Sequence, residues 1–181
     1  MKSLIIHPKD NSTVFLKPIY RSAENKTVVE KNASPQEVKN LMKESDRVMM
    51  MGHGSPRGLF NIHMFKDNRW YAIGDQDVEL LQGKSQNIYI WCNADKFVES
   101  HDLHGFYSGM FISEVGEARF CGLIDVTQEM VNESNNTFSE IVGEGINLPK
   151  EELYEKVVRE YGELAKANPV AAYNLERLFV R

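Results

Sequence analysis

Short continuous apolar runs alternate with amphipathic segments along the chain, a pattern that predicts buried strands connected by helices. The predicted strands cover residues 3–7, 27–30, 48–51, 87–91 and 119–124. The predicted helices cover a short, proline-interrupted stretch within 13–22, then 35–45, 76–82, a region from 94 to 117 broken near 104–105, then 127–142, and a last long helix opened by Pro149. Residues 57–74 are expected to form a hairpin or an irregular excursion. Successive strand, helix and strand units are typical of parallel sheets. We therefore expect one three-layer α/β/α domain over residues 1–181, with a mostly parallel central sheet.

The helix expected over residues 35–45 has the clearest local signal in the sequence. Ser34 is a favourable N-cap residue, and Pro35 suits the first helical position. Glu37 stands three residues after Ser34, which completes the capping-box pattern. The sequence therefore predicts that this helix begins at Pro35.

Composition and charge narrow the classes of partner. The chain has 181 residues, of which 42% are hydrophobic and 26% charged, and its formal net charge is −5. Nucleic acids and anionic membranes bind basic surfaces, so neither is an expected partner. No apolar stretch approaches the roughly 20 residues of a membrane span. The N-terminal apolar run is too short for a signal peptide, and only two cysteines occur, so a reducing cytoplasm is the expected compartment.

Two of the predicted strands end at residues that can perform chemistry. The strand at 48–51 leads into Gly52-His53-Gly54, and the strand at 87–91 leads into Cys92. Ligands of parallel sheets sit at the carboxyl ends of the strands, where an imidazole and a thiol would supply a base and a nucleophile. Gly54 has no Cβ, so its N–H is open to a substrate oxyanion. The same residues also suit a structural histidine, a tight turn and a small buried side chain.

The remaining candidate residues give weaker evidence of a functional site. Cys121 lies inside an apolar run and is expected to be part of the core. His101 and His104 have a spacing that can chelate, but no further ligand pair accompanies them, so we expect no metal site. Ser55 and Ser113 lack the Gly-x-Ser-x-Gly turn of many serine hydrolases. No glycine-rich phosphate loop follows a predicted strand, and no cofactor is expected.

The His-Gly pair after one buried strand and the cysteine after the next, 39 positions apart, resemble the clan CD cysteine peptidases. That group includes the caspases and the bacterial CHAT domains. The order of elements resembles theirs as well: strand, helix, short strand, helix, strand with His-Gly, excursion, helix, strand with Cys. Residues 108–118 and the ending at residues 168–174 are similar to the corresponding parts of CHAT domains.

The resemblance implies a caspase-like fold and a cysteine endopeptidase that cleaves a peptide or protein substrate through a thioester. It implies that His53 assists the chemistry, that Cys92 attacks the carbonyl, and that the N–H groups of Gly54 and Cys92 hold the oxyanion. No third catalytic residue is required in this group. Trp91 stands where caspases commonly have a small residue, so substrate preference does not transfer. Acidic residues that would select basic side chains are Asp75, Asp95 and Asp125.

Two other functions remain open. One is a non-catalytic scaffold or adaptor on the same fold, with a misaligned His53/Cys92 pair. The other is a small-ligand-binding α/β protein on a flavodoxin-like sheet. The arrangement of the two side chains distinguishes them: a peptidase needs His53 and Cys92 to share one open space, whereas a scaffold allows other segments to fill it.

Overall fold

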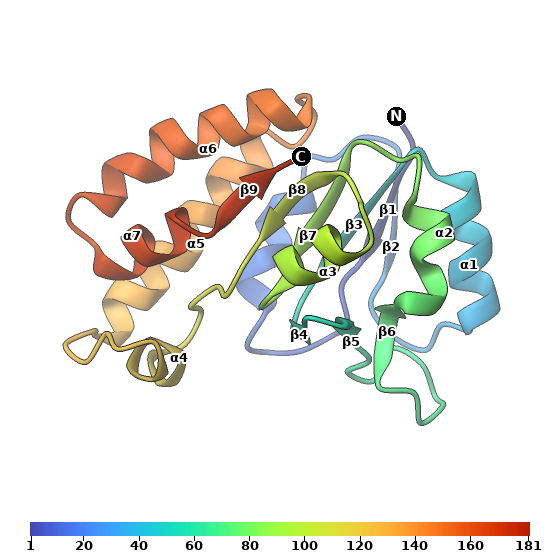
Figure 1. Ribbon diagram of the computed structural model, residues 1–181, viewed down its shortest axis with the longest axis horizontal. Coiled ribbons are helices and arrows are strands. Elements are labelled where there is room, and N and C mark those ends of the chain that lie inside the picture. The colour runs from blue at the N-terminus through green and yellow to red at the C-terminus, as the bar shows by residue number, and fades with distance from the viewer.

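Six strands form the central sheet of the computed structural model, which describes residues 1–181 (Figure 1). In spatial order they are β2 (Lys26–Val29), β1 (Ser3–Ile6), β3 (Arg47–Met51), β7 (Asn87–Ile90), β8 (Gly105–Ser108) and β9 (Leu178–Val180). All neighbouring pairs are parallel except the β8–β9 pair, which is antiparallel. The expected mixed α/β class with a mostly parallel sheet is confirmed.

Helices cover both faces of this sheet (Figure 1). One face packs against the 3-10 helix η1 (Val14–Tyr20) and the helices α5 (Gln128–Glu144), α6 (Lys150–Ala165) and α7 (Pro169–Leu175). The other face packs against α1 (Pro35–Glu44), α2 (Val78–Leu81) and α3 (Ala94–Ser100). Successive strand residues point to opposite faces, so Met49 joins the first core and Met50 the second. This explains why the strands read as continuous apolar runs.

The excursion expected over residues 57–74 is a small antiparallel sheet. It contains β4 (Gly54–Ser55), β5 (Gly58–Phe60) and β6 (Tyr71–Gly74), in that order. A short 3-10 helix, η2 (Asp75–Asp77), then leads into α2. Because β4 starts directly after His53, this sheet lies at the carboxyl edge of the central sheet.

The N-terminus of α1 has the predicted capping box. The Ser34 hydroxyl accepts a hydrogen bond from the Glu37 N–H at 3.1 Å, and the Glu37 carboxylate accepts one from the Ser34 N–H at 3.4 Å. Pro35 is the first helical residue. These bonds satisfy N–H groups that a helix leaves unpaired at its start.

The helical region expected over residues 94–117 is wrong in its middle. Gly105–Ser108 forms β8, which lies between β7 and β9 and is fully buried. Gly105 has a φ of +152°, and a Cβ there would lie 2.2 Å from the Asn87 carbonyl oxygen of the neighbouring strand. The glycine that suggested a helix break therefore permits close approach of two strands.

The strand expected over residues 119–124 is also wrong. The chain there completes α4 (Val115–Phe120) and then turns toward α5. Phe120 and Ile124 are 88% and 74% exposed, so the apolar run faces solvent. Cys121 ends α4 and is only partly buried, which corrects its placement in a core strand. The chain also continues past α6 into α7 and β9, which the sequence pattern did not predict.

Candidate functional site

His53 and Cys92 follow neighbouring strands at the same edge of the sheet. Met51 of β3 pairs with Ile90 of β7, and each of the two site residues lies two positions beyond its strand's paired residue. Both side chains line one cavity of about 20 Å³, together with Phe111 and other residues from η1 and the loop after β8. A cavity of this volume holds about one water-sized group. The structure therefore brings the predicted pair together around a small space.

The thiol of Cys92 is held in its protonated form. It donates a hydrogen bond to the Phe111 carbonyl oxygen at 3.5 Å, and its sulfur lies 3.9 Å from a carboxylate oxygen of Glu117. Burial first, and the negative charge of Glu117 second, raise the pKa of Cys92 to about 11. The thiol is therefore the dominant form at neutral pH.

The turn after Cys92 is set by Asn93. Asn93 has a φ of +65°, a left-handed conformation that asparagine tolerates better than most residues. Its N–H donates to the Gly109 carbonyl oxygen at 3.0 Å, which ties the turn to the end of β8. The Cys92 N–H itself makes no hydrogen bond within the protein. It is therefore free to bind a developing oxyanion.

His53 is bonded to a side chain that sequence reasoning did not select. Its Nε2 lies 2.7 Å from the Ser12 hydroxyl oxygen. The Ser12 hydroxyl and N–H lie 2.5 and 2.8 Å from the same carboxylate oxygen of Asp10. Hydrogen bonds from Ser12 lower the pKa of Asp10 below its ordinary value. The site thus contains a chain of three polar side chains: Asp10, Ser12 and His53.

The sequence held one signal for Ser12 and Asp10. The run Asp10-Asn11-Ser12, directly after the first predicted strand, consists of residues that favour turns, and it does form a turn. That strand is β1, the neighbour of β3 in the sheet. Because carboxyl ends of neighbouring parallel strands meet at one edge, polar residues after β1 come close to His53.

Gly54 does not line the cavity that His53 and Cys92 share. A Cβ on Gly54 would lie 2.2 Å from the Trp91 ring, so close packing against Trp91 requires glycine here. The Phe60 N–H bonds the His53 carbonyl oxygen at 2.8 Å, which makes Gly54 and Leu59 a non-hydrogen-bonded pair. The Gly54 N–H is therefore directed away from β5.

Trp91 connects the small antiparallel sheet of β4, β5 and β6 to the central sheet. Its side chain is 2% exposed, and its Nε1–H donates to the Ser55 carbonyl oxygen at 3.1 Å. Its ring packs against Phe97 of α3, with centroids 5.7 Å apart. Trp91 thereby connects β4, which follows His53, with α3, which follows Cys92.

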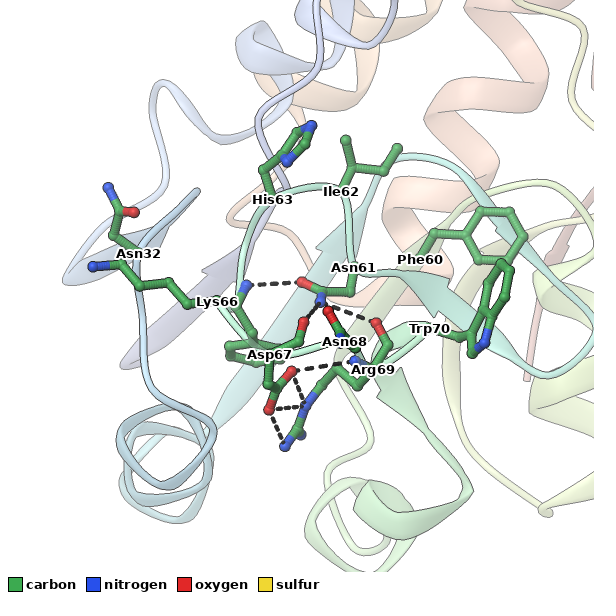
Figure 2. Close-up of a pocket in the computed structure, with 11 residues that line it drawn as sticks. Asn32, Phe60, Asn61, Ile62, His63, Lys66, Asp67, Asn68, Arg69 and Trp70 are labelled. Carbon is green, nitrogen blue, oxygen red and sulfur yellow. Dashed lines mark hydrogen bonds and ion pairs between the residues drawn. The ribbon is translucent and has the colours of Figure 1, made fainter.

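A larger pocket opens in the loop between β5 and β6 (Figure 2). Its volume is about 750 Å³. Asn61 organises the loop: its Oδ1 accepts from the Phe65 N–H at 2.7 Å, and its N–H donates to the Trp70 carbonyl oxygen at 2.9 Å. Trp70, at one end, is 81% exposed, and Lys66, at the other, has no ion-pair partner. The pocket thus offers an aromatic surface and a free positive charge.

The other predicted residues lie away from the cavity. His101 bonds Asp75 at 3.1 Å, and no group of three or more His, Cys, Asp or Glu side chains is placed to hold a metal ion. Asp95 lies 3.3 Å from the Lys96 amine, and Asp125 is exposed. None of the three aspartates lines the space beside Cys92.

No helix is both long enough and apolar enough to cross a membrane. Comparison of the chain with family models, with curated proteins and with solved structures finds no match in any of the three.

Proposed function

We propose that the protein is a caspase-like cysteine peptidase in which His53 and Cys92 form the catalytic dyad. One observation carries the proposal: an imidazole and a thiol line the same cavity at the carboxyl ends of two adjacent parallel strands. The free N–H of Cys92 supports it, because an oxyanion needs such a donor. The order of elements around the two strands supports it as well, since it resembles the order described above for the clan CD cysteine peptidases.

The proposed reaction begins with transfer of the Cys92 proton to His53. The thiolate attacks the scissile carbonyl carbon, and the free N–H of Cys92 stabilises the oxyanion. The C–N bond breaks, and His53 returns the proton to the leaving amine. Water then attacks the thioester carbonyl carbon, which releases the carboxylic acid and restores the thiol.

The resting site must open before this reaction can occur. The cavity is too small for a peptide, the Phe111 carbonyl oxygen is hydrogen-bonded to the thiol, and the charge of Glu117 favours the protonated thiol. Substrate binding would displace these groups from Cys92.

The test is covalent capture by a peptidyl chloromethyl ketone, combined with hydrolysis of a peptide mixture. We expect an adduct on Cys92 and cleavage by the native chain, both abolished in Cys92→Ala. Cys121→Ala is the matched control, because it removes the other thiol and leaves the site intact. An adduct and cleavage that persist in Cys92→Ala would exclude the dyad. Mass spectrometry of the labelled peptides gives the readout.

The protonated state of Cys92 favours a second candidate, a non-catalytic scaffold on the same fold. In that case the native chain neither forms the adduct nor cleaves peptides, although it is folded. The capture experiment therefore separates the two candidates directly.

Removal of the Glu117 charge is expected to make Cys92 more reactive. Glu117→Gln keeps an acceptor for the N–H groups of Ser113 and Glu114, at 2.7 and 3.1 Å, but removes the charge beside the thiol. We expect iodoacetamide to alkylate Cys92 about three- to tenfold faster at neutral pH, because a nearby like charge disfavours the thiolate. The control is Glu114→Gln, whose exposed carboxylate does not contact Cys92. Equal alkylation rates in the two variants would contradict the proposed role of Glu117.

A further inference from the structure

Three side chains join the loop after β1 to the residue after β3 by hydrogen bonds. Asp10, Ser12 and His53 are all partly exposed, so burial does not force them to pair. The bond from Ser12 to His53 nevertheless spans 41 positions and measures 2.7 Å. We infer that Asp10 and Ser12 hold His53 in the tautomer that carries its proton on Nε2, leaving Nδ1 as the basic nitrogen.

The position of each proton follows from which of the three side chains can donate and which can only accept. An ionised carboxylate only accepts hydrogen bonds, and the lowered pKa of Asp10 means that it is ionised at neutral pH. The separation of 2.5 Å between the Ser12 and Asp10 oxygens is typical of a hydroxyl that donates to a carboxylate. Ser12 has one hydroxyl proton, and Asp10 receives it. The Ser12 oxygen therefore accepts from His53, so the proton of that bond is on Nε2.

The consequence for chemistry rests on the proposed peptidase function. With Nε2 protonated, Nδ1 has the only lone pair on the ring and must receive the Cys92 proton. The charge on Asp10, relayed through Ser12, stabilises the imidazolium that this transfer creates. Ser12 and Asp10 are then positioning residues. Ser12 is not a nucleophile in this arrangement, because it donates its proton to Asp10 and not to His53.

The tautomer is tested by ¹⁵N NMR of the full chain labelled at histidine, which needs no activity. We expect Nε2 of His53 to have the chemical shift of a protonated ring nitrogen. We also expect its proton to exchange with water at least about tenfold faster in Ser12→Ala, since the acceptor is lost. Ser12→Thr retains a hydroxyl and is expected to restore the slow exchange. Asn11→Ala is the matched control in the same turn, where the side chain makes no hydrogen bond.

Two results would overturn the inference: an unprotonated Nε2 in the native chain, or equal exchange rates in the native chain and Ser12→Ala. A second readout addresses the catalytic role. If the chain cleaves peptides, Ser12→Ala is expected to lower kcat about tenfold with KM unchanged, and Ser12→Thr to recover it. If the NMR result is as expected but the chain has no peptidase activity, the inferred tautomer is retained and only the proposed function is rejected.

Discussion

Replacement of Trp91 by alanine is expected to lower the free energy of unfolding by about 4 kcal/mol. Trp91 is 2% exposed and contacts Phe97, so its removal leaves a cavity between α3 and the sheet. The substitution also removes the hydrogen bond from Nε1 to the Ser55 carbonyl oxygen, which holds β4 in place. The measurement is urea-induced unfolding followed by far-UV circular dichroism.

The other tryptophan of the chain provides the control for this experiment. Trp70 is 81% exposed, so Trp70→Ala is expected to change the free energy of unfolding by less than about 0.5 kcal/mol. Similar losses in the two variants would mean that Trp91 is not packed as described. Because each variant keeps one tryptophan, fluorescence of the remaining indole also reports whether it stays buried or exposed.

Acidification from about pH 7 to about pH 4 is expected to cost about 3 kcal/mol of stability through His7 alone. His7 is 2% exposed, and its ring nitrogens lie 3.0 and 3.1 Å from the hydroxyl oxygens of Tyr20 and Thr13. Burial is the main cause that lowers the pKa of His7 from 6.5 to about 4. Between these values the unfolded chain binds a proton that the folded chain does not. Stability is therefore complete above the unfolded pKa and is lost as the pH falls toward the folded pKa.

The His7→Gln variant isolates this contribution, because glutamine keeps polar groups and does not titrate. Chemical unfolding of both chains is measured at several pH values across the same window. We expect the native chain to lose about 3 kcal/mol more than His7→Gln, whatever the stability of the variant at neutral pH. Parallel curves for the two chains would show that His7 titrates alike in the folded and unfolded states.

The elements that the sequence predicts well are those with local causes. The start of α1 depends on Ser34 and Glu37, three residues apart, and the structure places it as expected. The strands β1, β3 and β7 are buried on both faces and therefore read as apolar runs. The order of the strands in the sheet does not follow their order in the chain, because β1 lies between β2 and β3.

The elements that the sequence does not predict depend on contacts between distant segments. β8 is a strand because β7 and β9 lie on either side of it, and β9 begins 178 − 108 = 70 positions after β8 ends. Phe120 and Ile124 resemble strand residues in type, but no neighbouring strand covers them. Local composition does not contain this information. The sequence therefore predicts a helix where β8 lies and a strand where α4 ends.

The residues of the candidate site also fall into a group that the sequence predicts and a group that it does not. His53 and Cys92 were identified because each follows an apolar strand, and they line one cavity. Ser12 and the charge of Glu117 were not, because both approach the pair from segments distant in sequence. The protonation state of Cys92 depends on its burial and on the charge of Glu117. Neither can be predicted from the residues next to Cys92 in the sequence.

The pairing of Met51 with Ile90 restricts where residues can be inserted into the chain or deleted from it. His53 and Cys92 face the same side of the sheet because each lies two positions beyond this pair. Insertion or deletion of one residue in either strand would turn one side chain to the opposite face. The segment between the strands, which contains the small sheet and α2, has no such constraint. Related chains that retain the site are therefore expected to differ in length between the two strands and not within them.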